Sequence, residues 1–232
     1  MRHIGIIGGI GPESTIAYYR SIIKVFQEKQ GMDSYPELTL RSIDLIRMLG
    51  MANSGNLEEL TKYLKSHLEI LKSAGAEYVA LASNTPHVVS ERLAQIIEIP
   101  IIDIAEETCK FISNANIKRV GLLGTKSTMN AGFYQMAGKK HGIEIVTPHS
   151  KAQDFVHEKY LSEIIFNHIV PDTKEKFREI MEELKHKEKI DGIIIGGTEL
   201  PFIMRQEEFH DIELFDTTQI HVTSIVNKII EG

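Results

Sequence analysis

Short apolar runs alternate along this chain with longer stretches in which apolar residues recur three or four positions apart. The short runs are rich in Ile and Val, as buried strands are, and the longer stretches have the spacing of helices. The predicted strands are His3–Gly8, Leu38–Asp44, Tyr78–Ala82, Ile101–Ile104, Arg119–Leu123, Glu144–Val146, Gly192–Ile195 and Glu213–Phe215. The predicted helices are Glu13–Gln30, Asn56–Ala74, Val88–Ile96, Ile104–Ile112, Asn130–His141, Asp154–Phe166, Lys174–Lys187 and Thr217–Ile230. This alternation predicts an α/β fold with parallel strands covered by helices.

Three segments of the first half of the chain have counterparts in the second half. The pairs are Ile4–Gly8 with Val120–Gly124, Gly75–Thr85 with Ile190–Glu199, and Ile99–Asp103 with Ile212–Asp216. Their common offset of about 113 to 116 residues predicts two pseudo-symmetric domains, each a parallel sheet covered by helices. We place these domains at residues 1-98 together with 209-232, and at residues 99-208. The C-terminal strand and helix are then expected to return to the first domain.

The loops after four predicted strands are rich in Gly, Ser, Thr and Asn. They span residues 8–14, 83–87, 124–128 and 196–200. In open α/β sheets, ligands bind beyond the carboxyl ends of the strands, where N–H groups are available. We therefore expect an active-site cleft between the two domains that binds a small carboxylate.

The composition is that of an ordinary globular protein, with 42% hydrophobic and 25% charged residues. The formal net charge is -6, and Lys and Arg are spread along the chain, so we expect neither nucleic acid nor membrane as a partner. Glycines interrupt the apolar start of the chain, which resembles neither a signal peptide nor a membrane span. We expect a cytoplasmic protein with a small-molecule partner.

The single cysteine, Cys109, excludes a disulfide within the chain and a metal site built from several cysteines. It falls in a predicted helix and is interpreted as a packing residue. The histidines do not recur with carboxylates at the spacing of metal ligands, so no metal site is expected. His221, on the last predicted helix, is interpreted as a surface or interface residue.

The glycine-rich segment Gly5–Thr15 does not fit the dinucleotide-binding fingerprint. Ser14 stands where a third glycine is needed, and Glu13 places negative charge where a pyrophosphate would bind. We interpret the segment as a tight strand-to-helix turn in which Gly9 and Gly11 bind a small anion.

Two short motifs follow equivalent predicted strands, namely Ala82-Ser83-Asn84-Thr85-Pro86-His87 and Gly196-Gly197-Thr198-Glu199-Leu200-Pro201. They resemble the paired motifs Cys-Asn-Thr-x-His and Gly-Cys-Thr-Glu of the aspartate/glutamate racemase superfamily. The resemblance extends over nearly the whole chain, through residues 8–15, 123–129 and 215–217.

The resemblance implies racemisation of an acidic amino acid without pyridoxal phosphate, metal or another cofactor. In that chemistry one thiolate removes the α-proton and the opposite thiol returns a proton on the other face. It further implies that His87 and Glu199 support the two cysteines. Because relatives of this kind commonly associate, a homodimer is a candidate assembly for this chain. The residues implied to hold the substrate carboxylates are Asn84, Thr85, Thr125, Thr128 and Thr198. Arg47 is a candidate partner for a side-chain carboxylate, because a guanidinium binds carboxylates in a bidentate manner. A solvated arginine at a helix start is the alternative.

Both cysteine positions of the superfamily lack a thiol in this chain. Ser83 and Gly197 occupy them. A serine hydroxyl needs an adjacent base before it can accept a proton, and glycine offers no side chain. Three explanations stay open: the two replacements were introduced, the chain is a natural variant whose base is His87, Glu199 or a bound water, or it is a binding protein that retains the cleft. A related decarboxylase or cis–trans isomerase is a further alternative.

Overall fold

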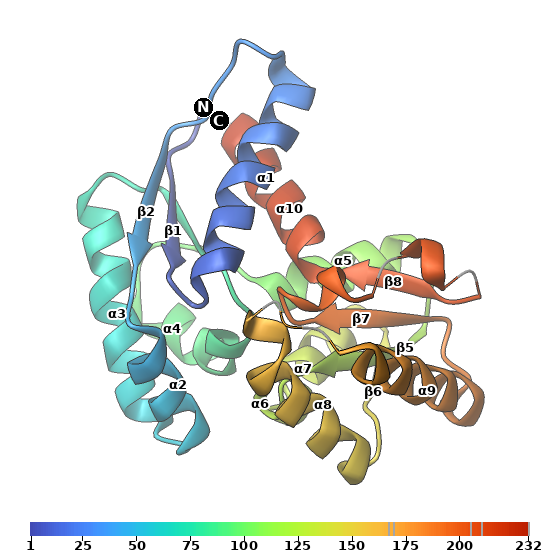
Figure 1. Ribbon diagram of the computed structural model, residues 1–232. Coiled ribbons are helices and arrows are strands. Elements are labelled where there is room, and N and C mark those ends of the chain that lie inside the picture. The colour runs from blue at the N-terminus through green and yellow to red at the C-terminus, as the bar shows by residue number, and fades with distance from the viewer. Residues whose placement is uncertain (167, 169, 205, 210, 232) are drawn as a thin grey trace. The chain divides into compact units, whose positions relative to one another are not determined.

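A computed structural model of the protein describes residues 1–166, 168, 170–204, 206–209 and 211–231. The chain forms two compact units, Met1–Glu107 with Thr218–Gly232, and Thr108–Thr217. The termini of the chain therefore belong to the same unit (Figure 1).

The first unit contains a parallel four-stranded sheet in the order β2-β1-β3-β4. Its strands are β1 (Ile4–Gly8), β2 (Leu38–Ser42), β3 (Tyr78–Leu81) and β4 (Ile101–Ile102). Its helices are α1 (Pro12–Gln30), α2 (Leu45–Asn53), α3 (Leu57–Ser73), the 3-10 helix η1 (Thr85–Val89), α4 (Ser90–Ile96), the start of α5 (Ile104–Asn114), and α10 (Thr217–Ile230).

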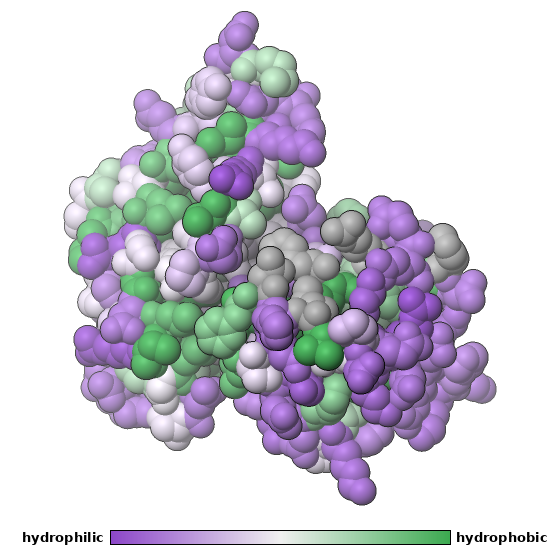
Figure 2. Space-filling view, viewed as in Figure 1, coloured by the Kyte–Doolittle hydropathy of each residue, from purple (hydrophilic) through white to green (hydrophobic). Residues whose placement is uncertain are grey.

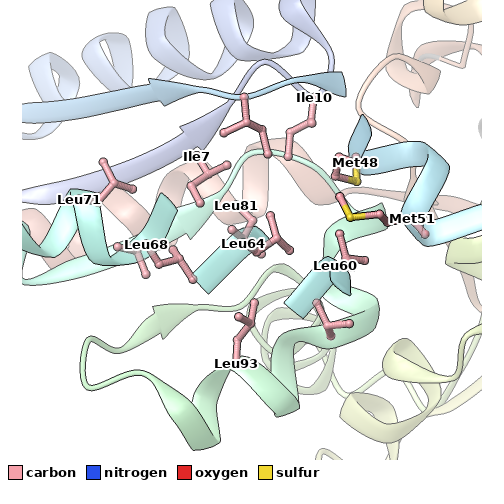
Figure 3. Close-up of a cluster of buried hydrophobic side chains, with 14 of the residues drawn as sticks. Ile7, Ile10, Met48, Met51, Leu60, Leu64, Leu68, Leu71, Leu81 and Leu93 are labelled. Atoms are coloured by element: carbon pink, nitrogen blue, oxygen red, sulfur yellow. The ribbon is translucent and has the colours of Figure 1, made fainter. Parts of the chain in front are cut away.

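The central strand β1 is buried along its whole length, and successive strand residues point to opposite faces, so it is covered on both faces of the sheet. On one face, Ile4 and Ile6 of β1 pack with a cluster from α1 and α10 that includes Phe26 and Val226. On the other face, β1 and β3 pack against α2 and α3, as Figure 3 shows for Ile7, Leu81, Met48, Leu64 and Leu68. A strand buried on both faces explains why the strand runs read as continuous apolar segments.

The second unit repeats this arrangement, with the parallel strand order β6-β5-β7-β8. Its strands are β5 (Arg119–Gly124), β6 (Glu144–Val146), β7 (Gly192–Gly196) and β8 (Glu213–Asp216). Its helices are α6 (Lys126–Asn130), α7 (Phe133–Lys140), α8 (Ser150–Ser162), η2 (Ile164–Phe166), α9 (Pro171–Glu188), η3 (Leu200–Phe202) and η4 (Gln206–Glu208). The prediction of two α/β domains, each a parallel sheet covered by helices, is confirmed.

The boundaries between the units lie further along the chain than residues 98/99 and 208/209. Strand β4 pairs with β3, and β8 pairs with β7, so each strand stays in the sheet of its own half. The prediction that the C-terminal strand returns to the first domain is wrong. Only α10 returns, and it does so because Val222, Ile225, Val226 and Ile229 pack in the core of the first unit.

Among the predicted elements whose bounds differ in the structure, two differ for clear local reasons. The strand expected to reach Asp44 ends at Ser42, and Asp44 instead caps α2 by accepting a hydrogen bond from the Arg47 N–H at 2.9 Å. The helix expected over Asn130–His141 is divided into α6 and α7, because Gly132 between them adopts a positive φ of 83°.

Hydrophilic side chains cover much of the face seen in Figure 2. The exposed large hydrophobic residues include Met32, Ile46 and Phe166, which belong to separate segments of the chain. Within the described ranges, no helix is both long and apolar enough to cross a membrane.

Candidate functional site

Each unit carries a cluster of polar residues at the carboxyl ends of its two central strands. In the first unit, β1 and β3 are parallel neighbours, with Ile7 opposite Leu81, so the turns that follow them leave the same edge of the sheet. In the second unit, Gly124 lies opposite Gly196, so the turns after β5 and β7 also leave one edge. We call these clusters the Ser83 half-site and the Gly197 half-site.

The glycine turn after β1 is held by Thr15. Gly9 has a φ of +82°, and a Cβ atom there would lie 2.4 Å from the Ser42 hydroxyl and 2.6 Å from the Ile43 carbonyl oxygen. The Gly9 N–H donates to the Thr15 hydroxyl at 2.8 Å, and that hydroxyl donates to the Gly11 carbonyl oxygen at 2.9 Å. The amide of Gly9 thus already has a partner within the turn, whereas Gly11 is the half-buried N-cap of α1.

Ser83 is half-buried and lies two residues after β3. Its N–H donates to the Leu81 carbonyl oxygen at 2.8 Å. Its carbonyl oxygen lies 2.9 Å from Nδ1 of His87. Among the described residues, the Ser83 hydroxyl has no hydrogen-bond partner. The turn therefore presents a hydroxyl that is open to a ligand.

His87 is buried, and both of its ring nitrogens contact the backbone. Nδ1 donates to Ser83, and Nε2 accepts from the Ile104 N–H at 3.3 Å. This arrangement fits a neutral imidazole, and burial lowers the pKa of His87. His87 therefore supports the backbone of the Ser83 turn, and neither nitrogen is left to act as a base.

Asn84 and Thr85 follow Ser83 and are also buried. The Asn84 carbonyl oxygen accepts from the His87 N–H at 3.0 Å, which closes the turn into η1. Both predicted carboxylate-binding residues thus lie in the Ser83 half-site.

A half-buried acidic group near His87, Asp103, was not assigned from the sequence. Asp103 caps α5 by accepting from the Ala105 and Glu106 N–H groups at 2.8 and 3.1 Å. Burial raises the pKa of Asp103, but His87 and the hydrogen bonds from Glu106, Ser90 and Ala105 bring it below its usual range. The signal was present in the sequence, since Asp103 ends one of the repeated segments.

His221 is fully buried, so its interpretation as a surface or interface residue is wrong. Nε2 donates to the Ile102 carbonyl oxygen at 2.8 Å, and Nδ1 accepts from the Tyr18 hydroxyl at 3.0 Å. Its ring centroid lies 6.2 Å from that of His87. Burial and the neighbouring His87 lower the pKa of His221 to about 4. The burial of His221 was not predicted from the sequence, because it depends on the apolar residues of α10 packing in the core of the first unit.

Arg47 lies in the first turn of α2 and is exposed. Its guanidinium carbon lies 4.6 Å from the centre of the Tyr63 ring, a cation–π contact. Nearby, Nε of Arg41 donates to Nδ1 of His67 at 2.7 Å. Burial first, and then Arg41 and Arg47, lower the pKa of His67. Two arginine side chains, those of Arg41 and Arg47, therefore act on His67 near this end of β2.

Thr125 and Thr128 form the first part of the Gly197 half-site. Thr125 caps α6, accepting from the Thr128 N–H at 3.2 Å, and the two hydroxyls lie 3.1 Å apart. A Cβ atom on Gly124 would lie 2.6 Å from the Gly196 carbonyl oxygen, so the two strand ends approach closely. The predicted pair of threonines is thereby brought beside the turn that follows β7.

Tyr160 of α8 is a second residue that was not assigned from the sequence. A Cβ atom at position 197 would lie 2.5 Å from its Cε2 and 3.0 Å from its hydroxyl oxygen. Its hydroxyl donates to the Glu199 carboxylate in a short hydrogen bond, and the Thr198 hydroxyl donates to the same oxygen at 2.8 Å. Burial and the charge of Glu199 raise the pKa of Tyr160 well above its usual value. The sequence contains one indirect sign that another residue fills this space, namely the lack of a side chain at Gly197.

No group of three or more His, Cys, Asp or Glu side chains in the described part of the chain could hold a metal ion. The side chains of the two half-sites are hydroxyls, amides, carboxylates and buried imidazoles, which can bind a carboxylate and transfer protons.

The chain resembles known racemases in sequence and in structure. It is 30% identical over 146 residues to the broad specificity amino-acid racemase RacX of Bacillus subtilis, an alignment that covers 62% of this chain and 63% of RacX. The matched part thus spans less than two thirds of that relative. The crystal structure of PH1733, an aspartate racemase homologue from Pyrococcus horikoshii OT3, is 34% identical, has a TM-score of 0.83, and covers 100% of this chain and 98% of its own.

A crystal structure of a protein from Yersinia pestis matches 99% of this chain and 100% of its own, with 30% identity and a TM-score of 0.91. The model of the Asp/Glu/hydantoin racemase family matches residues 7–225, which include both half-sites. The chain belongs to the Asp/Glu/hydantoin racemase family.

Proposed function

We propose that this protein binds aspartate, glutamate or a similar small dicarboxylate and exchanges the hydrogen on its α-carbon with solvent, without pyridoxal phosphate or metal. The observation that carries the proposal is the pair of equivalent strand ends at Ser83 and Gly197, each followed by buried hydroxyl groups within a chain of the racemase family. Relatives named as racemases of amino acids support this class of substrate.

The substrate carboxylates are bound by neutral groups and one cation. The neutral groups are Asn84, Thr85, Thr125, Thr128 and Thr198, with backbone N–H groups of the glycine turn at Gly11. Arg47 pairs with the side-chain carboxylate, which its exposure permits. The N–H of Gly9 already donates to the Thr15 hydroxyl, so the role of Gly9 is to shape the turn and not to bind the substrate.

Racemisation requires a proton carrier for each face of the α-carbon, and the two half-sites of this chain differ in the groups that they offer as carriers. Within the described residues of the first unit, His87 does not serve as a base for the Ser83 hydroxyl, because both of its ring nitrogens are hydrogen-bonded to the backbone. Inversion should therefore be slower than exchange of the α-hydrogen. Isotope exchange is the more sensitive measurement for this protein.

The test follows loss of the α-hydrogen signal of L- and D-aspartate and L- and D-glutamate by NMR in D₂O. We expect a time-dependent loss for at least one of the four. Pretreatment with iodoacetamide excludes contaminating thiol-dependent racemases, because the only cysteine here, Cys109, is fully buried. Absence of exchange with all four compounds, at high enzyme concentration and long incubation, would contradict the proposal.

A second candidate function is non-catalytic binding of a small carboxylate. It is favoured by the Tyr160 ring, which fills the space beside Gly197 where the superfamily has a thiol. It predicts that dicarboxylates raise the melting temperature without exchange, since a ligand that binds only the native state stabilises it. Product analysis with malonates and maleate in the same experiments tests decarboxylase and cis–trans isomerase activity.

A further inference from the structure

We propose that Tyr160 and Glu199 form a proton relay that takes the place of a thiol at position 197. The inference rests on the proposed function and names the group that carries the proton in the Gly197 half-site.

The position of the Tyr160 hydroxyl is the first observation. Its oxygen lies 3.0 Å from the point that a Cβ atom would occupy at residue 197, so it lies where a side chain at that residue would project. Glycine at 197 is what permits this approach, because Cε2 of the ring would be only 2.5 Å from such a Cβ atom. The phenol group and a side chain at 197 are therefore alternatives for the same space.

The partner of the hydroxyl is the second observation. Tyr160 donates its proton to the Glu199 carboxylate, and the Thr198 hydroxyl donates to the same carboxylate oxygen. All three side chains are buried, with 6%, 8% and 6% exposure for Tyr160, Thr198 and Glu199. Burial makes a tyrosinate anion costly, so any proton that Tyr160 accepts must be matched by one that it releases.

The relay meets this condition in one step. The phenol oxygen accepts the substrate α-hydrogen as a proton, while the phenol proton moves to the Glu199 carboxylate. The electron pair of the broken C–H bond stays on the substrate and is delocalised into its α-carboxylate. Before the return step, the phenol hydrogen, which is the former α-hydrogen, exchanges with solvent deuterium. The return step then places this deuterium on the α-carbon while Glu199 gives its proton back to the phenol oxygen. Tyr160 stays neutral at both ends of the step, and no oxidant or reductant is needed.

The alternative is that Tyr160 only fills space and anchors Glu199. A filling role would affect stability and substrate binding. The relay would affect the rate of proton transfer, that is, kcat. Measurement of kcat and KM separately therefore distinguishes the two roles.

The principal variant is Tyr160→Phe, which keeps the ring and removes the hydroxyl. We expect kcat for α-hydrogen exchange to fall about 100-fold or more, the size of a general acid–base contribution, with KM changed by less than about threefold. The matched control is Tyr134→Phe, since Tyr134 is a fully buried tyrosine of the same unit and belongs to α7, not to the turns that define the half-site. Its kcat should stay within about twofold of the wild type.

Glu199→Gln is the second variant, and it serves if Tyr160→Phe does not fold. The amide oxygen can still accept the Tyr160 hydrogen bond, but it cannot take up the proton, so kcat should again fall about 100-fold. Exchange by either folded variant at the wild-type rate would overturn the relay and leave the proposed function standing. Absence of exchange by the wild type would overturn both.

Discussion

The side chain of Tyr160 occupies the space into which a side chain at residue 197 would extend. A Cβ atom added to Gly197 would lie only 2.5 Å from Cε2 of the Tyr160 ring. The two residues are on different elements, α8 and the turn after β7, and Tyr160 is held in place by its bond to Glu199. A glycine at 197 and a tyrosine at 160 are thus mutually dependent features of this chain.

This dependence predicts the effect of restoring the cysteine of the superfamily. Gly197→Cys alone should lower the free energy of unfolding by about 1–3 kcal/mol, because its side chain overlaps the Tyr160 ring. Tyr160→Ala should cost about 3–5 kcal/mol through the cavity it leaves. The double variant should be more stable than the sum of the two predicts, by about 0.5–3 kcal/mol in a urea double-mutant cycle. Strict additivity would show that the two positions do not share this space.

Ser83→Cys should introduce a thiol at the other half-site without crowding. Position 83 is half-buried and its hydroxyl is open to a ligand, so the change replaces a poor base with one that ionises near pH 8.5. We expect α-hydrogen exchange to rise about tenfold or more at pH 8.5 and to become sensitive to iodoacetamide. Cys109→Ser provides the control background, because it removes the one native thiol, which is buried in α5, and leaves the introduced thiol at position 83 as the group that iodoacetamide can modify. A rate that neither rises nor responds to alkylation would count against Ser83 as a site residue.

The strands could be predicted from the sequence because they follow from local runs of apolar residues. The two similar sheets could be predicted because these runs recur in the second half of the chain. The runs Ile4–Gly8 and Val120–Gly124 are buried on both faces. The similarity of Gly75–Thr85 to Ile190–Glu199 placed Ser83 and Gly197 at equivalent strand ends. The role of Tyr160 was not accessible, because it depends on a contact between residues far apart in the chain. His221 was misjudged for a related reason, since its burial depends on which unit receives α10.

Buried histidines predict how stability changes with pH. The folded-state pKa of His221 is lowered from 6.5 to about 4, so between these values the unfolded state binds a proton that the folded state does not. Stability is therefore fully present above about pH 6.5 and is lost as the pH falls toward 4, by up to about 1.4 kcal/mol per pH unit for this one group. The lowered pKa of His87 acts in the same direction. Urea denaturation at pH 7.5, 6 and 5 measures the slope, and His221→Gln should reduce it. A slope unchanged in this variant would show that His221 does not carry the dependence.

Gly9→Ala tests two reasons for glycine in the turn after β1, namely the positive φ of the residue and the lack of space for a Cβ atom. A positive φ alone costs an alanine about 1–2 kcal/mol. Gly55 has a φ of +72° with no atoms near a Cβ position, so Gly55→Ala measures that cost by itself. Gly9 has a φ of +82°, and its Cβ position lies 2.4 Å from the Ser42 hydroxyl and 2.6 Å from the Ile43 carbonyl oxygen. We expect Gly9→Ala to destabilise the protein by about 1–3 kcal/mol more than Gly55→Ala, as overpacking does. Equal losses in urea denaturation would mean that β2 gives way readily and that the turn is not fixed by this contact.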